Sequence, residues 1–140
     1  MPEFVLDKEH REGMPPFKSL PDFVQGYIEA MFFTDTDEDD DGCSIKPDSG
    51  YYHLSKDAMD GILADCNTFF ETEGVITALE GSRSLEEAGR DFWFTRNGHG
   101  VGYWDRDVGS YADPDLLTKV SHKFGECYPC TGDDGLVYID

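Results

Sequence analysis

Apolar residues recur at helical spacing in three stretches of the chain, and these stretches predict its main helices. The first begins near position 19 or 21 and ends near 33, the second runs from Ser55 to Phe70 or beyond, and the third opens at Asp113. Side chains three or four positions apart share one face of a helix, so each stretch presents an apolar face to a core. Ser55 and Asp113 suit the N-cap position, and Pro114 suits the first helical turn.

Two shorter elements lie between the second and third helices. Ser84, followed by Glu86 and Glu87, predicts an N-capped short helix, because a hydroxyl cap and early acids both stabilise a helix N-terminus. Residues 75–79 fit either a further helical turn or a short strand. Gly125 is expected to end the third helix as a left-handed cap.

Two further stretches predict β-hairpins. Asn97-Gly98 stands between two aromatic-rich runs, and this dipeptide is the preferred two-residue hairpin turn. We expect strands near 92–96 and 99–104, and a second hairpin within residues 126–139. The predicted fold class is therefore α+β: three main helices packed on a four-stranded, mainly antiparallel sheet made of two hairpins, in the order α-α-ββ-α-ββ.

The length of 140 residues fits a single domain. Residues 1–18 have little apolar periodicity and predict an extended N-terminal arm, and residues 19–140 predict one α+β domain that includes an acidic loop at 34–50. No run approaches the roughly 18 apolar residues of a membrane helix, and the N-terminus lacks the basic and apolar regions of a signal peptide. We therefore expect a cytoplasmic protein with no membrane partner.

The charge of the chain narrows its range of partners. There are 30 Asp and Glu residues against 11 Lys and Arg residues, which gives a formal net charge of −19 and a pI near 4.2. An aromatic content of 14% is too high for a disordered acidic chain. Binding to DNA phosphates or to anionic lipid requires clustered Lys and Arg, so we expect no direct contact with nucleic acid or membranes. A surface of this sign attracts basic proteins.

The size of this charge is comparable with that of DNA. A globule of this length has a diameter of roughly 37 Å. B-DNA of that length carries about 22 charges, at one per ~1.7 Å of axis. The match favours mimicry of DNA by a protein surface. Acidic solubility, adaptation to high salt and calcium binding are the alternatives that the composition leaves open.

Acidic residues gather in several places, and these are the candidate phosphate mimics. They lie in the predicted acidic loop, on the second helix and around the start of the third helix. Carboxylates three or four positions apart on a helix have Cβ atoms about 5–6 Å apart, a spacing that extended side chains widen toward that of phosphates. The candidates are Asp35, Asp37, Glu38, Asp39, Asp40, Asp41, Asp57, Asp60, Asp65, Asp105, Asp107, Asp113 and Asp115.

The stretch from Ala88 to Arg106 resembles a block found in a family of small acidic proteins encoded by bacteriophages and plasmids. Those proteins carry a similar Asp-Phe-Trp-x-Thr-Arg-Asn-Gly-His-Gly-x-Gly-Phe-Trp-Asp sequence, in which Tyr103 here stands where Phe is usual. The segments 27–30, 65–69 and 132–135 are also similar, so the resemblance covers roughly residues 20–140. It implies an origin in a mobile element and supplies no catalytic residues.

The predicted first hairpin carries a cluster of polar and aromatic residues, which we interpret as structural. Its members are Trp93, Arg96, Asn97, Gly98, His99, Tyr103 and Trp104. Arg96 and His99 would flank the turn as a cross-strand pair, held by hydrogen bonds and an Arg–Asp ion pair. Catalysis would need a nucleophile beside an oriented His, and the nearby hydroxyls of Thr95 and Ser110 have no such setting. We therefore expect no catalytic residue and no enzyme activity.

Part of the acidic loop resembles a calcium-binding loop. Asp37, Asp39 and Asp41 match the first half of an EF-hand loop. The second half does not match, because Pro47 stands where the exiting helix would begin and Asp48 replaces the bidentate Glu. We expect no cofactor and no strong metal site, with these three aspartates as a weak divalent-cation possibility.

Four cysteines are present, and two of them form a lone Cys-x-x-Cys pair at Cys127 and Cys130. A structural zinc ion would need two further ligands. In a chain without a predicted signal peptide, free thiols in a reducing compartment are the simpler interpretation.

Together these features predict an acidic phage or mobile-element protein that inhibits a host nucleic-acid-binding protein by DNA mimicry. The expected partner is a basic host protein such as a CRISPR effector, a restriction or other defence nuclease, or a DNA repair enzyme. The alternative is a divalent-cation-binding interaction module built on the Asp-rich loop 35–48. The sequence indicates no particular oligomeric state.

Overall fold

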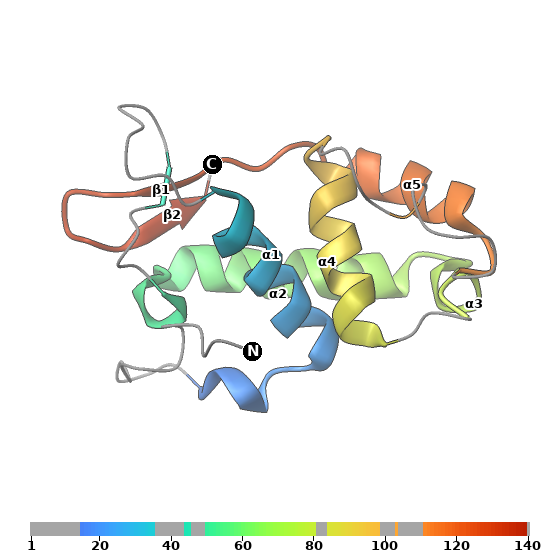
Figure 1. Cartoon of the computed structure of the whole chain (residues 1–140), viewed down its shortest axis with the longest axis horizontal. Helices are drawn as coiled ribbons and strands as arrows, with labels where there is room; N and C mark the ends of the chain where they lie inside the picture. The colour runs from blue at the N-terminus through green and yellow to red at the C-terminus, as the bar shows by residue number, and fades with distance from the viewer. Residues whose placement is uncertain are drawn as a thin grey trace.

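The computed structural model describes residues 15–35, 44–45, 50–80, 84–98, 103 and 111–139. In chain order its elements are the 3₁₀ helix η2 (Phe17–Ser19), α1 (Asp22–Asp35), the 3₁₀ helix η3 (Tyr51–His53), α2 (Lys56–Glu71), α3 (Val75–Ala78), α4 (Leu85–Arg96), α5 (Pro114–Lys123), β1 (Pro129–Thr131) and β2 (Val137–Ile139). Figure 1 shows their arrangement in space.

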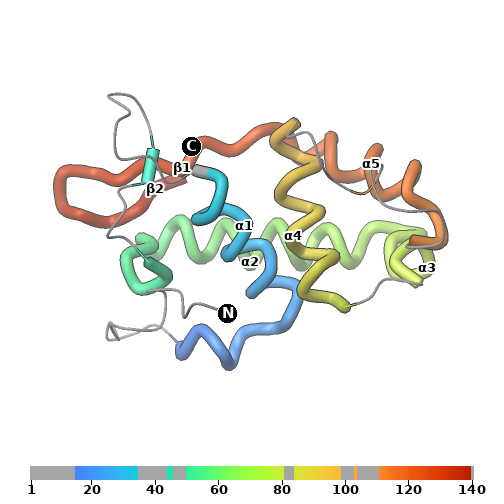
Figure 2. The backbone as a smooth tube through the Cα atoms, viewed as in Figure 1, coloured from blue at the N-terminus to red at the C-terminus, as the bar shows by residue number. Residues whose placement is uncertain are grey.

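The other helices are arranged along the length of α2 (Figure 1). α1 and α4 lie side by side across α2, α5 lies next to α4, and α3 stands at the C-terminal end of α2. Strands β1 and β2 form an antiparallel pair in which Cys130 lies opposite Tyr138. The backbone trace in Figure 2 shows this hairpin near the start of α2, and α3 and α5 near its end.

The structure corrects the predicted fold class. Its described residues form five α-helices and one two-stranded antiparallel sheet, rather than three main helices on a four-stranded sheet made of two hairpins. The predicted strand at 92–96 is wrong, because residues 85–96 form the single helix α4. The C-terminal hairpin is present, with its turn at residues 132–136.

Helix α4 forms because its start, its buried face and its end all favour a helix. The hydroxyl of Ser84 accepts the backbone N–H of Glu87 (3.1 Å), as predicted, but the helix continues for about three turns. Asn97 is the C-cap, and Gly98 follows it with φ of +70°. A glycine with positive φ ends a helix as readily as it completes a hairpin turn. Here the close packing of the preceding residues against α1 decides between the two.

The other predicted helices are confirmed. α1 and α2 cover the first two apolar stretches, and Ser55 is the N-cap of α2. Asp113 caps α5 by accepting the N–H of Leu116 (3.1 Å), with proline in the first turn. Gly125 has φ of +75° just beyond α5. Residues 75–78, for which helix and strand both remained open, form the short helix α3.

The helices α1 and α4 cross with their backbones in contact. A Cβ atom on Gly26 of α1 would lie 1.9 Å from the carbonyl oxygen of Glu86. A Cβ atom on Gly89 of α4 would lie 1.9 Å from the carbonyl oxygen of Phe23. Nonbonded atoms do not approach this closely, so any larger side chain at either position would push the two helices apart. The two glycines therefore set the spacing of this helix pair.

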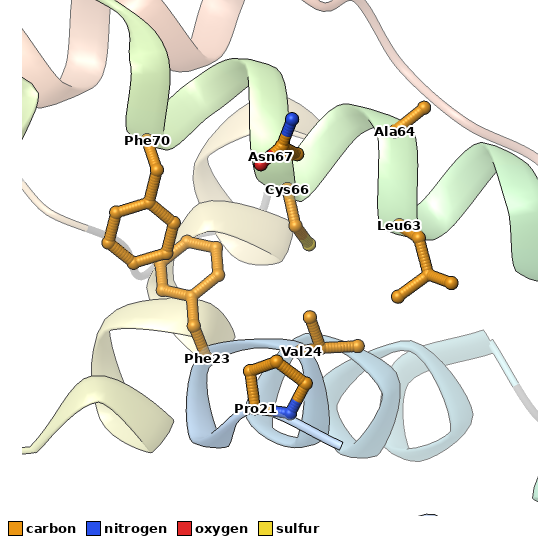
Figure 3. A pocket seen from close by; sticks show the side chains of 8 residues that line it. All are labelled: Pro21, Phe23, Val24, Leu63, Ala64, Cys66, Asn67 and Phe70. Atoms are coloured by element: carbon orange, nitrogen blue, oxygen red, sulfur yellow. The ribbon is translucent and has the colours of Figure 1, made fainter. Parts of the chain in front are cut away.

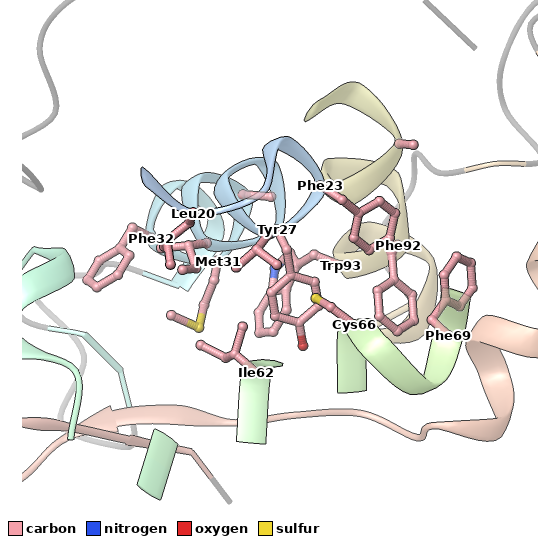
Figure 4. Close-up of a cluster of buried hydrophobic side chains, with 14 of the residues drawn as sticks. Leu20, Phe23, Tyr27, Met31, Phe32, Ile62, Cys66, Phe69, Phe92 and Trp93 are labelled. Atoms are coloured by element: carbon pink, nitrogen blue, oxygen red, sulfur yellow. The ribbon is translucent and has the colours of Figure 1, made fainter. Parts of the chain in front are cut away.

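Aromatic rings fill the space between α1, α2 and α4 (Figure 4). The rings of Phe69 and Phe92 stack at 4.3 Å, and those of Tyr27 and Trp93 meet edge to face at 5.2 Å. The indole N–H of Trp93 donates to the hydroxyl of Thr34 (2.8 Å). No buried side-chain nitrogen or oxygen among the described residues lacks a hydrogen-bond partner. Three helices thus share one core whose polar atoms are satisfied.

The C-terminal hairpin is hydrogen-bonded to the N-cap residue of α2. The backbone N–H of Ser55 donates to the carbonyl oxygen of Val137 (2.9 Å). In the turn, the carboxylate of Asp134 accepts the hydroxyl of Tyr138 and the backbone N–H of Leu136. These donors stabilise the ionised carboxylate and lower the pKa of Asp134 below its ordinary value, with the Tyr138 hydroxyl as the larger cause.

Alanine at the two crossing glycines is predicted to destabilise the fold. Gly26→Ala and Gly89→Ala should each lower the free energy of unfolding by about 2 kcal/mol or more, because the helices must separate to admit the methyl group. Gly61→Ala is the matched control: its Cβ meets nothing within 4 Å in the middle of α2, so it should raise stability by about 0.5–1 kcal/mol. Urea unfolding followed by circular dichroism measures all three. Equal stability of Gly89→Ala and Gly61→Ala would contradict the close crossing.

Removal of one hydroxyl is predicted to change the titration of the turn. Tyr138→Phe should raise the pKa of Asp134 toward its ordinary value, because the larger of the two stabilising donors is lost. An aspartate whose pKa is lower in the folded than in the unfolded protein stabilises the fold at a pH above its unfolded pKa. That contribution to the free energy of unfolding disappears as the pH falls through the pKa of the folded state. An NMR titration of the side-chain carboxyl carbon measures the shift. An unchanged pKa in Tyr138→Phe would show that the hydroxyl makes no such contribution.

Candidate functional site

Arg96 lies at the C-terminal end of α4 and binds three other segments. Its Nη1 donates to the hydroxyl of Tyr27 (3.0 Å) and to Oδ2 of Asp65 (2.8 Å). Its Nε and Nη2 donate to the backbone carbonyls of Gly125 (2.8 Å) and Phe124 (2.9 Å), just beyond α5. A cation at this position also offsets the negative end of the helix dipole. The side chain, only 4% exposed, therefore joins α4 to α1, α2 and the end of α5.

The surroundings of Arg96 maintain its charge. Burial lowers the pKa of Arg96, but the hydrogen bond and the negative charge of Asp65 act against burial, and the pKa is raised above the ordinary value. The guanidinium carbon lies 5.7 and 5.5 Å from the ring centres of Phe92 and Phe124, whose faces attract a cation. Burial also raises the pKa of Tyr27, so its hydroxyl stays protonated. Arg96 is thus a permanent cation within the fold.

A second arginine is also engaged inside the structure. Nη2 of Arg90 lies 3.0 Å from Oε1 of Glu29 on α1 and 2.5 Å from Oε1 of Glu86, one turn away on α4. The side chain of Glu29 is 5% exposed, and this buried carboxylate would be costly without a cationic partner. The two arginines of α4 therefore bind three carboxylates that belong to the packing of the helices.

Among the described residues, most acids on the outer side of α2 and at the start of α5 make no ion pair with Lys or Arg. The exposed acids that make no ion pair within the described part of the chain include Asp57, Glu71, Glu73 and Asp115. Asp60 meets Lys56 at 3.4 Å, and both side chains are exposed. An exposed pair of this kind contributes roughly 0–1 kcal/mol and compensates little charge. These surface acids therefore keep most of their electrostatic effect.

Three of these carboxylates share one side of α2. At 100° per residue, Asp57, Asp60 and Glu71 lie within about 60° of one another around the helix. They are spread over a helix of 16 residues, which is about 24 Å long. We call these three residues the acidic face of α2.

A surface groove continues beyond the C-terminal end of α2. It has a volume of about 530 Å³ and is lined by Glu73, Asp113 and Asp115 on one part. Lys119 and Lys123 line another part of the same groove. The charge of this groove is therefore mixed, unlike that of the acidic face of α2.

A pocket of about 380 Å³ opens beside the acidic face, between α2 and the segment that follows α5. α2 contributes Asp57, Gly61 and Asp65, which follow one another at a spacing of four and so share one side of the helix. Glu126 lines the pocket from the other segment, and Arg96 also lines it. We call this cavity the Arg96 pocket.

A second hollow, of about 490 Å³, lies between α1 and α2 (Figure 3). Leu63 and Cys66 of α2 point toward Val24 and Pro21 on the side of α1. Apart from Asn67, the lining is apolar. Burial raises the pKa of the Cys66 thiol well above its ordinary value. This thiol is therefore a protonated packing group rather than a nucleophile.

The predicted phosphate mimics differ in their surroundings. Three are exposed on helices: Asp57, Asp60 and Asp115. Two have structural partners: Asp65, which pairs with Arg96, and Asp113, which caps α5. Asp35 is the last residue of α1. Those outside the described residues are Asp37, Glu38, Asp39, Asp40, Asp41, Asp105 and Asp107.

The described residues of the predicted hairpin cluster belong to α4 and the segments after it rather than to a hairpin. Those that the structure describes are Trp93, Arg96, Asn97, Gly98 and Tyr103. Arg96 does form an ion pair with an aspartate, but this is Asp65 on α2. Tyr103 is buried, and its hydroxyl donates to the carbonyl oxygen of Ala88 (2.7 Å). His99 and Trp104 lie outside the described residues, as does the cross-strand pairing expected for His99.

Sequence reasoning did not identify the Arg96 pocket. The spacing of Asp57, Gly61 and Asp65 is a local signal for one helix face, and it was available in the sequence. Glu126 comes from a segment more than sixty positions further along the chain. No local pattern brings it to α2, because its position depends on how α5 packs.

Within the described ranges, no three His, Cys, Asp or Glu side chains are placed to hold a metal ion. Cys127 and Cys130 are half-buried. The half-motif of Asp37, Asp39 and Asp41 lies outside those ranges. The described cysteines and acids therefore provide no set of metal ligands.

Comparison with known proteins finds no matching family model, no matching curated protein and no matching solved structure. Within the part of the chain that the structure describes, no helix is both long enough and apolar enough to cross a bilayer. Inference about function therefore depends on the charges and cavities of the site itself.

Replacement of the buried guanidinium is predicted to destabilise the whole fold. Arg96→Lys should lower the free energy of unfolding by about 3 kcal/mol, because an ammonium group does not reach Asp65, Tyr27 and both backbone carbonyls together. Lys56→Gln is the control, because it removes only an exposed ion pair and should change stability by less than about 0.5 kcal/mol. Urea unfolding at neutral pH compares them. Wild-type stability of Arg96→Lys would show that the network is dispensable.

Proposed function

We propose that this protein binds a basic nucleic-acid-binding protein and occupies its nucleic-acid channel in place of DNA. The observation that carries the proposal is the internal engagement of Arg90 and Arg96. Because these cations bind carboxylates within the helix packing, the acidic face of α2 has no arginine partner in the described part of the chain. The three carboxylates of this face are exposed.

The packing of α2 against the core makes its acidic face suitable for binding a partner. The opposite side of the helix is anchored in the core by Ile62, Cys66 and Phe69. Its carboxylates are therefore held on a backbone that does not need to be ordered on binding, which lowers the entropic cost of association. A row of charges over about 20 Å also attracts a cationic groove from a distance and increases the association rate.

The proposed action is occupancy of a binding site rather than catalysis. A protein that neutralises clustered Lys and Arg displaces counterions as DNA does, and so competes with DNA for the same groove. The resemblance to phage and plasmid proteins makes a host defence nuclease, a CRISPR effector or a DNA repair enzyme the proposed class of target. The host cytoplasm is the compartment in which such targets act.

Capture followed by competition with DNA tests this proposal. The immobilised protein is incubated with nuclease-treated bacterial lysate at low salt, and bound proteins are eluted with duplex DNA at constant ionic strength. We expect basic proteins that duplex DNA releases, because DNA and the acidic face bind the same cationic groove. Each released protein is then purified, and its dissociation constant is measured over a series of salt concentrations.

Two triple variants separate the acidic face from total charge. Asp57→Asn/Asp60→Asn/Glu71→Gln removes the acidic face, and Asp22→Asn/Glu80→Gln/Asp133→Asn removes three exposed charges elsewhere. The first variant should weaken binding by about tenfold or more and flatten its salt dependence. The second should change the affinity by less than about threefold. Equal losses in the two variants, or bound proteins that DNA does not release, would contradict the proposal.

A further inference from the structure

We propose that the Arg96 pocket receives an arginine side chain of the basic partner. This inference rests on the proposed function, which supplies a partner rich in arginine and lysine. It adds one specific anchor to an interaction that otherwise depends on the overall charge of a helix face.

The walls of the pocket match the stem of an arginine side chain. Ala58 and Ile62 of α2 line the cavity with Ile139 of β2, and together they provide an apolar surface. Arginine buries its methylene groups against such a surface while its head makes polar contacts. The cavity volume of about 380 Å³ lies within the range of pockets that bind small ligands.

The polar groups of the pocket select a cation. Asp57, Asp65 and Glu126 line it, and Arg96 is the only Lys or Arg among the lining residues. Arg96 already makes four hydrogen bonds inside the protein. It therefore compensates Asp65 but makes no ion pair with Asp57 or Glu126. The pocket has an excess of negative charge beside apolar walls.

One of these carboxylates is held in place from outside the pocket. Oε2 of Glu126 accepts a hydrogen bond from the hydroxyl of Tyr128 (2.6 Å). This hydrogen bond does not involve its second oxygen. Asp65 likewise uses Oδ2 for Arg96, so its Oδ1 is not part of that ion pair.

The arrangement favours a guanidinium group over a metal ion. The lining carboxylates are not among any group placed to hold a metal ion within the described residues. A guanidinium group has five N–H donors in one plane and bridges acceptors that are too far apart for a single ion. Lysine offers a compact charge without that planar fork, so we expect it to bind more weakly.

A small probe tests the pocket directly. N-acetyl-argininamide is titrated into the ¹⁵N-labelled full chain, with N-acetyl-citrullinamide as the uncharged match and N-acetyl-lysinamide as the cationic match. We expect saturable shifts of the backbone amides of Gly61, Gly125 and Cys127, with a dissociation constant in the millimolar range for arginine. The lysine probe should bind several-fold more weakly, and citrulline should produce no saturable shifts.

Variants that change the pocket in two different ways complete the test. Gly61→Phe adds an aromatic ring to the wall of the cavity and removes none of its charged residues. The backbone admits the larger side chain, because a Cβ at this position meets nothing within 4 Å. Glu126→Gln keeps the shape and removes a charge. Each should weaken binding of the arginine probe by about tenfold. Asp115→Asn is the matched control, because it removes an exposed charge away from the pocket, and it should bind the probe as the wild type does.

The outcomes separate this inference from the proposed function. Equal binding of the arginine and citrulline probes, or unchanged binding by Gly61→Phe, would overturn the arginine pocket. If DNA-releasable partners are captured equally by wild type and Gly61→Phe, the proposed function stands and the pocket inference fails. If the arginine probe binds as expected but no DNA-releasable partner is captured, the pocket stands and the proposed function fails.

Discussion

The guanidinium of Arg96 holds together four segments that are far apart in the sequence. It reaches the hydroxyl of Tyr27 on α1, the carboxylate of Asp65 on α2 and two carbonyl oxygens just beyond α5, from its own place at the end of α4. A buried cation is stable only where its charge and its hydrogen bonds are satisfied, and here the folded chain provides both. The aromatic core and the crossing of α1 and α4 lie against this network, so the path of the chain after α5 depends on it.

The pairing of the arginines on α4 with carboxylates also affects the charge of the surface. Arg90 and Arg96 pair with Glu29 and Asp65 on neighbouring helices, and Arg90 also pairs with Glu86 on its own helix. The acids of α2 that face solvent are left to repel one another and to attract cations. The Arg96 pocket contains carboxylates of both kinds, since Asp65 pairs with Arg96 and Asp57 belongs to the acidic face. Fold stability and the proposed partner recognition therefore depend on the same distribution of charge.

Local patterns predicted the parts of the structure that depend on local physics. The caps at Ser55 and Asp113 and the helical spacing of apolar residues identified α1, α2 and α5, because these signals act within a few residues. Asn97-Gly98 was misread because positive φ serves both a hairpin and a helix end, and packing against α1 decides between them. The partners of Arg96 and the place of Glu126 beside α2 come from contacts between distant segments. That the partner is cationic stays a prediction from charge composition, which does not identify the carboxylates that remain uncompensated.

The salt dependence of stability tests the central claim, that the carboxylates on the surface are uncompensated while the arginines pair inside. Screening relieves repulsion between exposed like charges and affects buried pairs much less. The free energy of unfolding in urea should therefore rise as potassium chloride increases from low to physiological concentration and above. Asp57→Asn/Asp60→Asn/Glu71→Gln should be more stable than the wild type at low salt and should gain less from added salt. A stability that falls with salt, or the same gain in the variant, would show that the surface charges are already paired.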